Sequence, residues 1–306
     1  MPRVVVFGGS GFLGRALTEF FVAQKHEVVL ISRADSGLAT RFAPWDGETL
    51  GEWTREVDGA DAVINVAGRS VNCRYNDANK AQILESRAHT TRLIAAAIAQ
   101  AHTPPRVWLN SSSATYYRHA QDRAMDEATG EAGQGFSVEV VRAWEEALFE
   151  SDLPQTRRVA LRLAMVFGPG RGGVYDAFAH LVKMGFGGPM AGGRQYVSWI
   201  HVADFARACD FLIHNQNLSG PINVAAPHPV TNVQFLSDLR QSLGVPYALP
   251  TARWQLEVGA LAMGTETELL LKSRRVVPKR LLDAGFAFEF ARWRDAARDI
   301  SSINRR

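Results

Sequence analysis

Cysteine is scarce in this chain of 306 residues, which contains only Cys73 and Cys209, far apart in the sequence. No CxxC motif and no His/Cys ligand spacing occurs, so we expect neither a disulfide framework nor a bound metal. No apolar run approaches the ~18–20 residues that a membrane span needs. The N-terminus MPRVVVFGG also lacks the longer apolar stretch of a signal peptide. These absences predict a cytoplasmic protein with no membrane partner.

Net charge is also modest, at +3, and most of the excess is local. It gathers in KSRRVVPKR (272–280) and in the C-terminal pair of arginines. A nucleic-acid-binding surface combines clustered basic residues with aromatic ones on one face, a pattern that this sequence does not show. We therefore expect no nucleic-acid partner and interpret the basic segment as a solvated face. With 46% hydrophobic residues, the chain can bury a large core.

The first half of the chain alternates short apolar runs with longer amphipathic segments. Near-continuous apolar strands that alternate with helices are typical of a parallel sheet covered on both faces. The fold class that we predict is therefore α/β, with a Rossmann-type doubly wound parallel sheet. The expected strands are residues 3–9, 26–33, 61–68, 106–113 and 157–169, and the expected helices are 14–24, 77–101 and 138–151.

The pattern changes after about residue 170, where a glycine-rich, irregular stretch begins. We assign residues 1–170 to a nucleotide-binding domain and 171–306 to a smaller, mainly helical lobe. Residues 199–226 are expected to return to the first domain. Within this half, the expected helices are 202–215, 232–244 and 255–273, and the expected strand is 220–226.

A glycine motif joins the first expected strand to the first expected helix. The chain reads GGSGFLG from Gly8, with Gly8, Gly11 and Gly14 at G-x-x-G-x-x-G spacing. Glycines let the backbone turn tightly and approach a pyrophosphate, while the helix N-terminus offers free N–H groups to the anion. The motif predicts a dinucleotide site formed by residues Gly8, Gly9, Ser10, Gly11, Phe12, Leu13 and Gly14.

The end of the second strand indicates which dinucleotide is bound. NAD sites usually place an acidic residue there for the ribose hydroxyls, whereas this chain has Ser32 and Arg33. Arginine pairs with a 2′-phosphate through two N–H groups, and serine can add a hydrogen bond. The predicted cofactor is therefore NADP, with Asp35 expected to lie beyond reach.

With these residues placed, the chain resembles the short-chain dehydrogenase/reductase superfamily in its extended, epimerase-like form. INVAG (64–68) is similar to the Asn-Ala-Ala-Gly segment of that superfamily, and SSSATYY (111–117) to its serine strand end, with Ser113 at the place of the catalytic serine. WIHVADFA (199–206) is similar to its His-Val-x-Asp motif. Over nearly its whole length the chain looks like an atypical group of NADP-binding epimerase family proteins, also called cell-division-inhibitor-like. The segments that carry this narrower resemblance are RYNDANKAQILESRAHTT (74–91), AWEEAL (143–148), GFGGPMAGGRQYVSWIH (185–201), INVAAPHPVTNVQF (222–235) and VVPKRLLDAGFAFEF (276–290).

The resemblance implies a Rossmann-type fold with bound NADP and a small family-specific domain at about residues 245–295. Superfamily members often dimerise through two helices, so it also allows a homodimer. The cofactor contacts that it implies are Ser32, Arg33, Val66, Ala67, Gly68, Gln82, Arg87 and Val166.

The usual catalytic pair of the superfamily is missing. Its tyrosine and lysine, four residues apart on one helix, move a proton while the nicotinamide exchanges a hydride. Here the corresponding segment reads FSVEVVRAWEEA from Phe136, with Ser137 or Val138 at the tyrosine position and Val141 or Arg142 at the lysine position. The remaining catalytic candidates are Ser113 and Tyr117, although a role in the substrate wall or in packing suits Tyr116 and Tyr117 better than proton donation.

The substrate pocket is expected between the sheet edge and the second lobe, with Arg74, Tyr75, Gln195, Trp199 and His201 as candidates. His201 either titrates there or fixes the helix that follows it. We interpret the chain as an NADP-dependent, epimerase-like oxidoreductase of an unidentified small molecule. The missing pair leaves open a non-catalytic NADP(H)-binding redox sensor or regulatory binding protein, and a cell-division role rests only on the name of the group.

Overall fold

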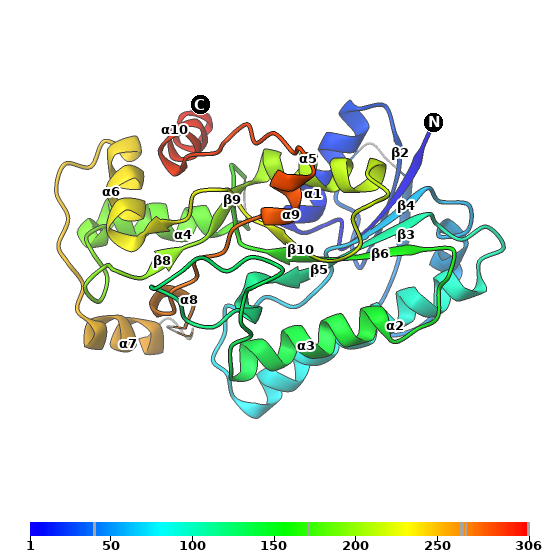
Figure 1. Cartoon of the computed structure of the whole chain (residues 1–306), viewed down its shortest axis with the longest axis horizontal. Helices are drawn as coiled ribbons and strands as arrows, with labels where there is room; N and C mark the ends of the chain where they lie inside the picture. The colour runs from blue at the N-terminus through cyan, green and yellow to red at the C-terminus, as the bar shows by residue number, and fades with distance from the viewer. Residues whose placement is uncertain (39–40, 171, 263–265, 267, 305–306) are drawn as a thin grey trace.

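A seven-stranded sheet, with every neighbouring pair of strands parallel, forms the centre of the molecule (Figure 1). The computed structural model describes residues 1–38, 41–170, 172–262, 266 and 268–304. Strand order is β10-β6-β5-β4-β1-β2-β3, the order of a doubly wound Rossmann sheet extended by one strand. The predicted fold class is therefore confirmed. The strands are β1 (Arg3–Phe7), β2 (Glu27–Ser32), β3 (Arg41–Pro44), β4 (Ala62–Asn65), β5 (Val107–Ser113), β6 (Arg157–Leu163) and β10 (Gly220–Val224).

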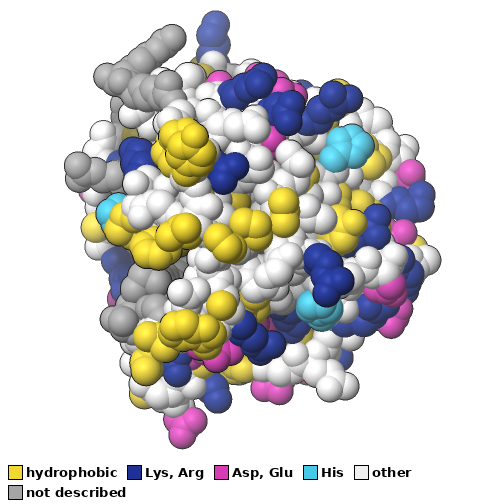
Figure 2. All heavy atoms as spheres, turned by 90° about the vertical axis from the view of Figure 1, so that its left-hand side faces the viewer, with side chains coloured by type: hydrophobic (Ala, Val, Ile, Leu, Met, Phe, Trp, Pro, Cys, Tyr) yellow, Lys and Arg dark blue, Asp and Glu magenta, His cyan; other side chains and the backbone are white. Residues whose placement is uncertain are grey.

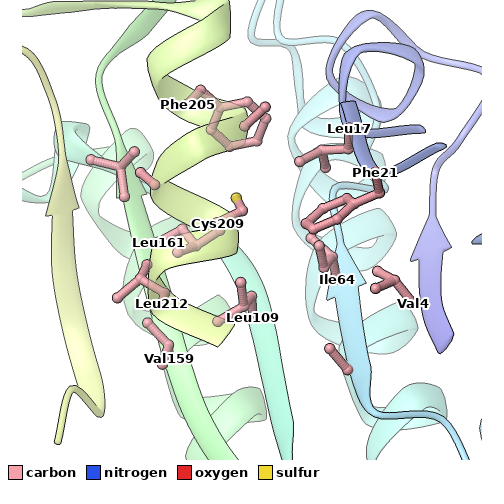
Figure 3. Packing of buried hydrophobic residues seen from close by; sticks show 14 of the residues in the cluster. Val4, Leu17, Phe21, Ile64, Leu109, Val159, Leu161, Phe205, Cys209 and Leu212 are labelled. Carbon is pink, nitrogen blue, oxygen red and sulfur yellow. The ribbon is translucent and has the colours of Figure 1, made fainter. Parts of the chain in front are cut away.

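Helices cover both faces of this sheet. Helices α1 (Phe12–Ala23) and α5 (Val202–His214) pack on one face, and α2 (Asp77–Gln100) and α3 (Phe136–Phe149) on the other (Figure 1). Alternate residues of β1 serve the two faces, because side chains of a strand point to opposite sides in turn. Val4 and Val6 join the α1/α5 core, while Val5 and Phe7 join the other. Figure 3 shows the first of these cores, with Leu17, Phe21, Phe205, Cys209 and Leu212 of the helices facing Val4, Ile64, Leu109, Val159 and Leu161 of the strands.

A second lobe has a core of its own, centred on Phe167, Trp199, Phe235 and Trp293. The rings of Phe235 and Trp293 stack with centroids 4.4 Å apart. Hydrophobic side chains also reach the surface of this lobe, including Trp254 and Val258 of α7, and Figure 2 shows several on that face. The elements of the lobe are α4 (Val174–Leu181), the π-helical turn η3 (Val182–Phe186), β8 (Tyr196–Val197), β9 (Trp199–His201), β11 (Val230–Thr231), α6 (Asn232–Leu243), α7 (Arg253–Ala262), α8 (Glu268–Leu271) and α10 (Trp293–Ile303). Helix α9 (Lys279–Asp283) packs instead against β10 of the main sheet.

Several predicted elements differ from the observed ones. The expected strand 157–169 is two strands, since β7 (Met165–Phe167) leaves the main sheet and pairs with β9. Residues 220–224 do return to the sheet as β10, whereas β9 stays outside it. Strand β3 was missed. Of the expected helix 255–273, the structure gives α7 and α8, and residues 263–265 and 267 between them lie outside the described residues. Among the described helices, none has the length and apolar character to cross a membrane.

Candidate functional site

The glycine motif forms the turn between β1 and α1. Gly8 has a φ of +81°, a left-handed conformation that glycine adopts without strain. Its N–H donates to the carbonyl oxygen of Ile31, and its own carbonyl accepts from the N–H of Gly11 at 3.0 Å. A Cβ at Gly14 would lie 2.4 Å from the Gly8 oxygen, so only glycine lets α1 start this close to the strand. The N-terminus of α1 is thereby held at the carboxyl edge of the sheet, where a diphosphate binds in this fold.

A cavity of about 950 Å³ opens at this edge, within the range of small-molecule sites. Of the predicted cofactor residues, those that line it are Gly8, Ser10, Gly11, Ser32, Arg33, Val66, Ala67, Gly68 and Gln82. The predicted residues outside its lining are Gly9, Phe12, Leu13, Gly14, Arg87 and Val166. The cavity thus joins the glycine turn, the ends of β2 and β4, and the α2 residues between Gln82 and Thr90.

Ser32 and Arg33 stand at the carboxyl end of β2. The Ser32 hydroxyl donates to the carbonyl oxygen of Ala34 at 2.5 Å. Arg33 is exposed and lines both the main cavity and an adjoining one of about 340 Å³. No described residue forms an ion pair with Arg33. Its guanidinium is therefore available to an anionic ligand. The nearby Asp35 carboxylate accepts a hydrogen bond from the N–H of Gly37 at 3.0 Å.

Trp45 and Asp46 also line the cavity, and sequence reasoning missed them because it missed β3. The N–H of Trp45 donates to the carbonyl of Ser32, which places the residues after β3 beside those after β2. Hydrogen bonds from the Thr49 hydroxyl and the Glu48 and Thr49 N–H groups lower the pKa of Asp46 to about 2. A short alternation of apolar residues in RFAPW would have been the only signal for this strand.

A buried asparagine pair fixes the end of β4. The Asn65 side-chain N–H donates to Asn110 Oδ1 at 2.7 Å, and Asn65 Oδ1 accepts from the N–H of Ala67 at 3.0 Å. The backbone of Val66 and Ala67 packs directly against Gly8, where an added Cβ would lie 2.8 Å from Ala67. The predicted segment 66–68 is therefore held against the glycine turn.

Arg87, a predicted cofactor contact, holds a loop. Its guanidinium donates to the carbonyl oxygens of Ile83 and Arg69, each at 3.0 Å, and lies over the ring of Trp144 at 5.1 Å. Burial lowers its pKa to about 10. The structure supports a positioning role for Arg87 behind the cavity wall.

Ser113 closes β5 above a buried polar network. Its hydroxyl oxygen accepts from the N–H of Thr115 at 3.2 Å and caps the following 3-10 turn, η2 (Ala114–Tyr116). Beneath it, Arg162 of β6 meets Glu145 of α3 through two hydrogen bonds of 2.8 Å, and the Ser112 hydroxyl donates to the same carboxylate at 2.6 Å. This network anchors the serine strand end to α3.

Tyr117, proposed from the sequence as an acid, is part of that network and only 1% exposed. Its hydroxyl donates to Asn223 Oδ1 at 2.8 Å and accepts from Arg162 at 3.1 Å. Burial raises the pKa of the hydroxyl. Because both partners are protein groups and the side chain is buried, the structure favours packing over proton donation. Tyr116 is only partly buried, and its ring lies 3.6 Å from the Arg162 guanidinium, a contact that suits packing.

The positions of the missing tyrosine and lysine hold no replacement of the same kind. Val138 and Val141 are buried, and Arg142 is exposed. Ser137, however, donates from its hydroxyl to Glu268 Oε2 at 2.8 Å, across 131 residues of sequence. Glu268 was not foreseen, because no local pattern links it to α3.

The Glu268 carboxylate lies between cations. Its Oε1 accepts from Lys272 Nζ at 3.2 Å and from Arg274 at 3.4 Å. Burial alone would raise the pKa of Glu268, but the Ser137 hydroxyl and these two cations outweigh it and lower the pKa. The carboxylate is therefore ionised at neutral pH.

The five substrate candidates do not converge on one cleft. Tyr75 lies near Ser137, with its ring 5.0 Å from that of Phe136. Arg74 forms an ion pair with Glu266 at 3.4 Å, and the same carboxylate accepts from the N–H of Tyr75 at 3.0 Å. These contacts tie the loop before α2 to the C-terminal segment.

The other three candidates are buried in the second lobe. Gln195 lines a separate cavity of about 460 Å³ and donates to the carbonyl of Met190. Trp199 is 0% exposed and packs against Trp293 with ring centroids 5.2 Å apart, so it is a core residue. His201 is also buried, and its Nδ1 caps α5 by accepting from the N–H of Ala203. Of the two roles that the sequence left open for His201, the structure favours the one of fixing the helix.

Comparison with known proteins agrees with this geometry. The model of the NAD dependent epimerase/dehydratase family matches residues 4–225, and that of a domain of unknown function, DUF1731, matches residues 257–300. The mouse epimerase family protein SDR39U1 is 32% identical, over 97% of this chain and 99% of the relative. An epimerase family protein of Mycobacterium leprae is 33% identical, over 93% and 91%. The crystal structure of human SDR39U1 with NADPH matches with a TM-score of 0.86 at 30% identity, over 98% of this chain and 99% of that one.

Proposed function

The chain belongs to the NAD dependent epimerase/dehydratase family, and from that premise we propose that it is an NADP(H)-dependent oxidoreductase acting on a small alcohol or carbonyl compound. Bound NADP(H) supplies or accepts the hydride. The observation that carries the proposal is Arg33, an exposed guanidinium with no ion-pair partner among the described residues, at the mouth of a dinucleotide-sized cavity.

The residues present fit this cofactor. Gly8 and Gly11 form the tight turn that brings the start of α1 to a diphosphate, and a side chain at Gly8 would strike Ala67. Arg33 carries the donors for a 2′-phosphate, the group that separates NADP from NAD, and the Ser32 hydroxyl beside it donates to Ala34 in this structure. The related human SDR39U1 was crystallised with NADPH, which supports the same choice here.

The residues at the proton-transfer positions differ from those usual in the superfamily. Ser113 stands at the serine position of the superfamily, but the tyrosine and lysine positions hold Ser137 or Val138 and Val141 or Arg142. That absence favours a second candidate function, a non-catalytic NADP(H)-binding redox sensor. The two differ in whether the bound cofactor is consumed.

A panel of aldehydes, ketones and nucleotide sugars tests the enzymatic proposal, with NADPH oxidation followed by its absorbance. We expect turnover of at least one member, faster with NADPH than with NADH, and a marked loss in Ser113→Ala. If NADPH binds in the micromolar range but no member of the panel consumes it, the sensor is the better account.

We also propose a reducing, cytoplasmic setting, because Cys73 and Cys209 are both free thiols and Cys209 is wholly buried. No nucleic-acid or membrane partner is part of the proposal, and a homodimer is an expectation from the superfamily. Size-exclusion chromatography with light scattering tests the assembly.

A further inference from the structure

Ser137 lies in the first turn of α3, at one of the two positions where the superfamily places its proton-carrying tyrosine. Its hydroxyl donates to Glu268 Oε2 at 2.8 Å, so a carboxylate from the C-terminal segment reaches the place that the tyrosine leaves. Both groups are partly buried. A hydroxyl bonded to an ionised carboxylate is a short path along which a proton can move.

Glu268 has a lysine four residues after it, which is the spacing of the tyrosine and lysine that this chain lacks. Lys272 follows Glu268 by four residues and contacts its carboxylate at 3.2 Å, as the superfamily lysine follows its tyrosine by four residues. The charged or titratable groups that face Glu268 are Lys272 and Arg274 from its own segment and Tyr75 from the loop before α2. The two cations keep the carboxylate ionised.

A second observation indicates that this region receives a polar ligand group. Arg274 is 9% exposed, and its Nε is buried without a hydrogen-bond partner among the described atoms. A buried donor without a partner destabilises the folded protein, and that cost is the desolvation of its N–H group. An oxygen atom of a ligand would remove that cost, and the Tyr75 hydroxyl lies beside the same group of residues.

We propose that Ser137 and Glu268 together carry the proton that the missing tyrosine carries elsewhere in the superfamily. The inference rests on the proposed oxidoreductase function. In the oxidising direction, the substrate alcohol loses its hydroxyl proton to Ser137 Oγ, and Ser137 passes its own proton to Glu268. At the same time the hydrogen on the alcohol carbon leaves with the electron pair of its bond, as a hydride, to NADP. The alcohol becomes a carbonyl, and Glu268 later releases the proton to water. In the reducing direction each transfer runs backwards.

Turnover is the first test, using the fastest member of the carbonyl panel. Glu268→Gln and Ser137→Ala should each lower kcat by about 100-fold or more, the usual range for losing a proton carrier. Glu268→Asp should recover part of the loss. The control is Glu257→Gln on α7, an exposed carboxylate that is also paired with a cation four residues away, Arg253. It should leave kcat unchanged.

A second test needs no turnover. The oxidised nicotinamide carries a positive charge that the reduced one lacks, so a carboxylate beside it favours NADP⁺ over NADPH. Glu268→Gln should therefore lower the ratio of NADP⁺ affinity to NADPH affinity by about three- to tenfold. That range is what Coulomb's law gives for a carboxylate and a nicotinamide charge several ångströms apart in a partly hydrated site. Glu257→Gln should not change that ratio.

The outcomes separate the two proposals. If wild-type protein consumes no panel member, the oxidoreductase function fails, while the affinity ratio still reports whether Glu268 faces the nicotinamide. If wild type turns over and both Glu268→Gln and Ser137→Ala remain fully active, the proton path is wrong. An unchanged affinity ratio in folded Glu268→Gln overturns it as well. Thermal melting of each variant establishes that it is folded.

Discussion

The ion pair between Glu145 and Arg162 offers the sharpest test of how the site is held together. Arg162 of β6 meets the carboxylate through two hydrogen bonds, and the side chains are 7% and 12% exposed for Arg162 and Glu145. Ser112 and Tyr117 complete the network beneath Ser113. We predict that Glu145→Gln destabilises the protein strongly, because it leaves the arginine charge buried without its counterion.

The magnitude follows from the burial of the pair. Removing one partner of a buried ion pair costs about 3–5 kcal/mol. Since a little water reaches Glu145, we take the lower end, about 3 kcal/mol. For a chain of this size each kcal/mol shifts the melting temperature by about 2 °C, so the expected fall is about 6 °C.

Glu150→Gln is the matched control. Glu150 caps the same helix, α3, and pairs with Arg92 at 2.7 Å, but those side chains are 39% and 49% exposed. An exposed pair contributes less than about 1 kcal/mol, so this variant should melt within about 2 °C of wild type. Calorimetry and urea unfolding measure both. Equal losses in the two variants would refute the reasoning, as would a stable Glu145→Gln protein.

Three further predictions concern the turn, the helix cap and the cofactor. Gly14→Ala should lower the free energy of unfolding by about 1–3 kcal/mol and weaken NADPH binding, because its Cβ would lie 2.4 Å from the Gly8 oxygen. The control is Gly51→Ala, whose Cβ would have its nearest neighbour at 3.6 Å and which should change neither stability nor binding. Urea unfolding and fluorescence titration measure the two effects. Burial lowers the pKa of His201 below 6.5, so the unfolded chain binds more protons and stability falls as pH drops through that range. His201→Asn, which keeps a capping oxygen, should lose this part of the pH dependence when urea midpoints are compared at about pH 7.5 and about pH 5.5, and an unchanged slope argues against it. Arg33→Asp should weaken NADPH binding by about 10- to 100-fold and leave NADH binding nearly unchanged, since it removes charge-assisted bonds to the 2′-phosphate.

Local patterns were enough to predict which residues meet at the cavity beside the glycine turn. Gly8, Gly11 and Gly14 follow a strand and open a helix, while Ser32 ends the next strand and Arg33 comes directly after it. Chain connectivity alone brings these residues to one edge of a parallel sheet. Strand β3 was missed because four residues give too short an alternation to recognise, and the cavity residues Trp45 and Asp46 were missed with it.

The proposed catalytic half of the site could not be predicted in the same way, because its contacts are long-range. Ser137 and Glu268 are 131 residues apart, and Tyr117 and Asn223 are 106 apart. Tyr117 follows the serine strand end, as a residue at the mouth of the site would. Only the structure shows that its hydroxyl turns toward Asn223 and Arg162 in the interior.

Trp199 and His201 illustrate a related limit. Their segment follows a glycine-rich stretch that suits a binding loop, yet β9 pairs with β7 and carries both side chains into the second core. Predicting this would have required knowing that the expected strand 157–169 ends at Leu163 and begins again at Met165 in another sheet.

Equilibrium titration with NADPH and NADH, followed by nicotinamide fluorescence in wild type and Arg33→Asp, tests the central claim most directly. That claim is that Arg33 makes this an NADP(H) site. The account predicts that wild type binds NADPH at least about tenfold more tightly than NADH and that Arg33→Asp removes the preference. Equal affinity of wild type for the two cofactors, or a preference that survives in Arg33→Asp, would contradict it.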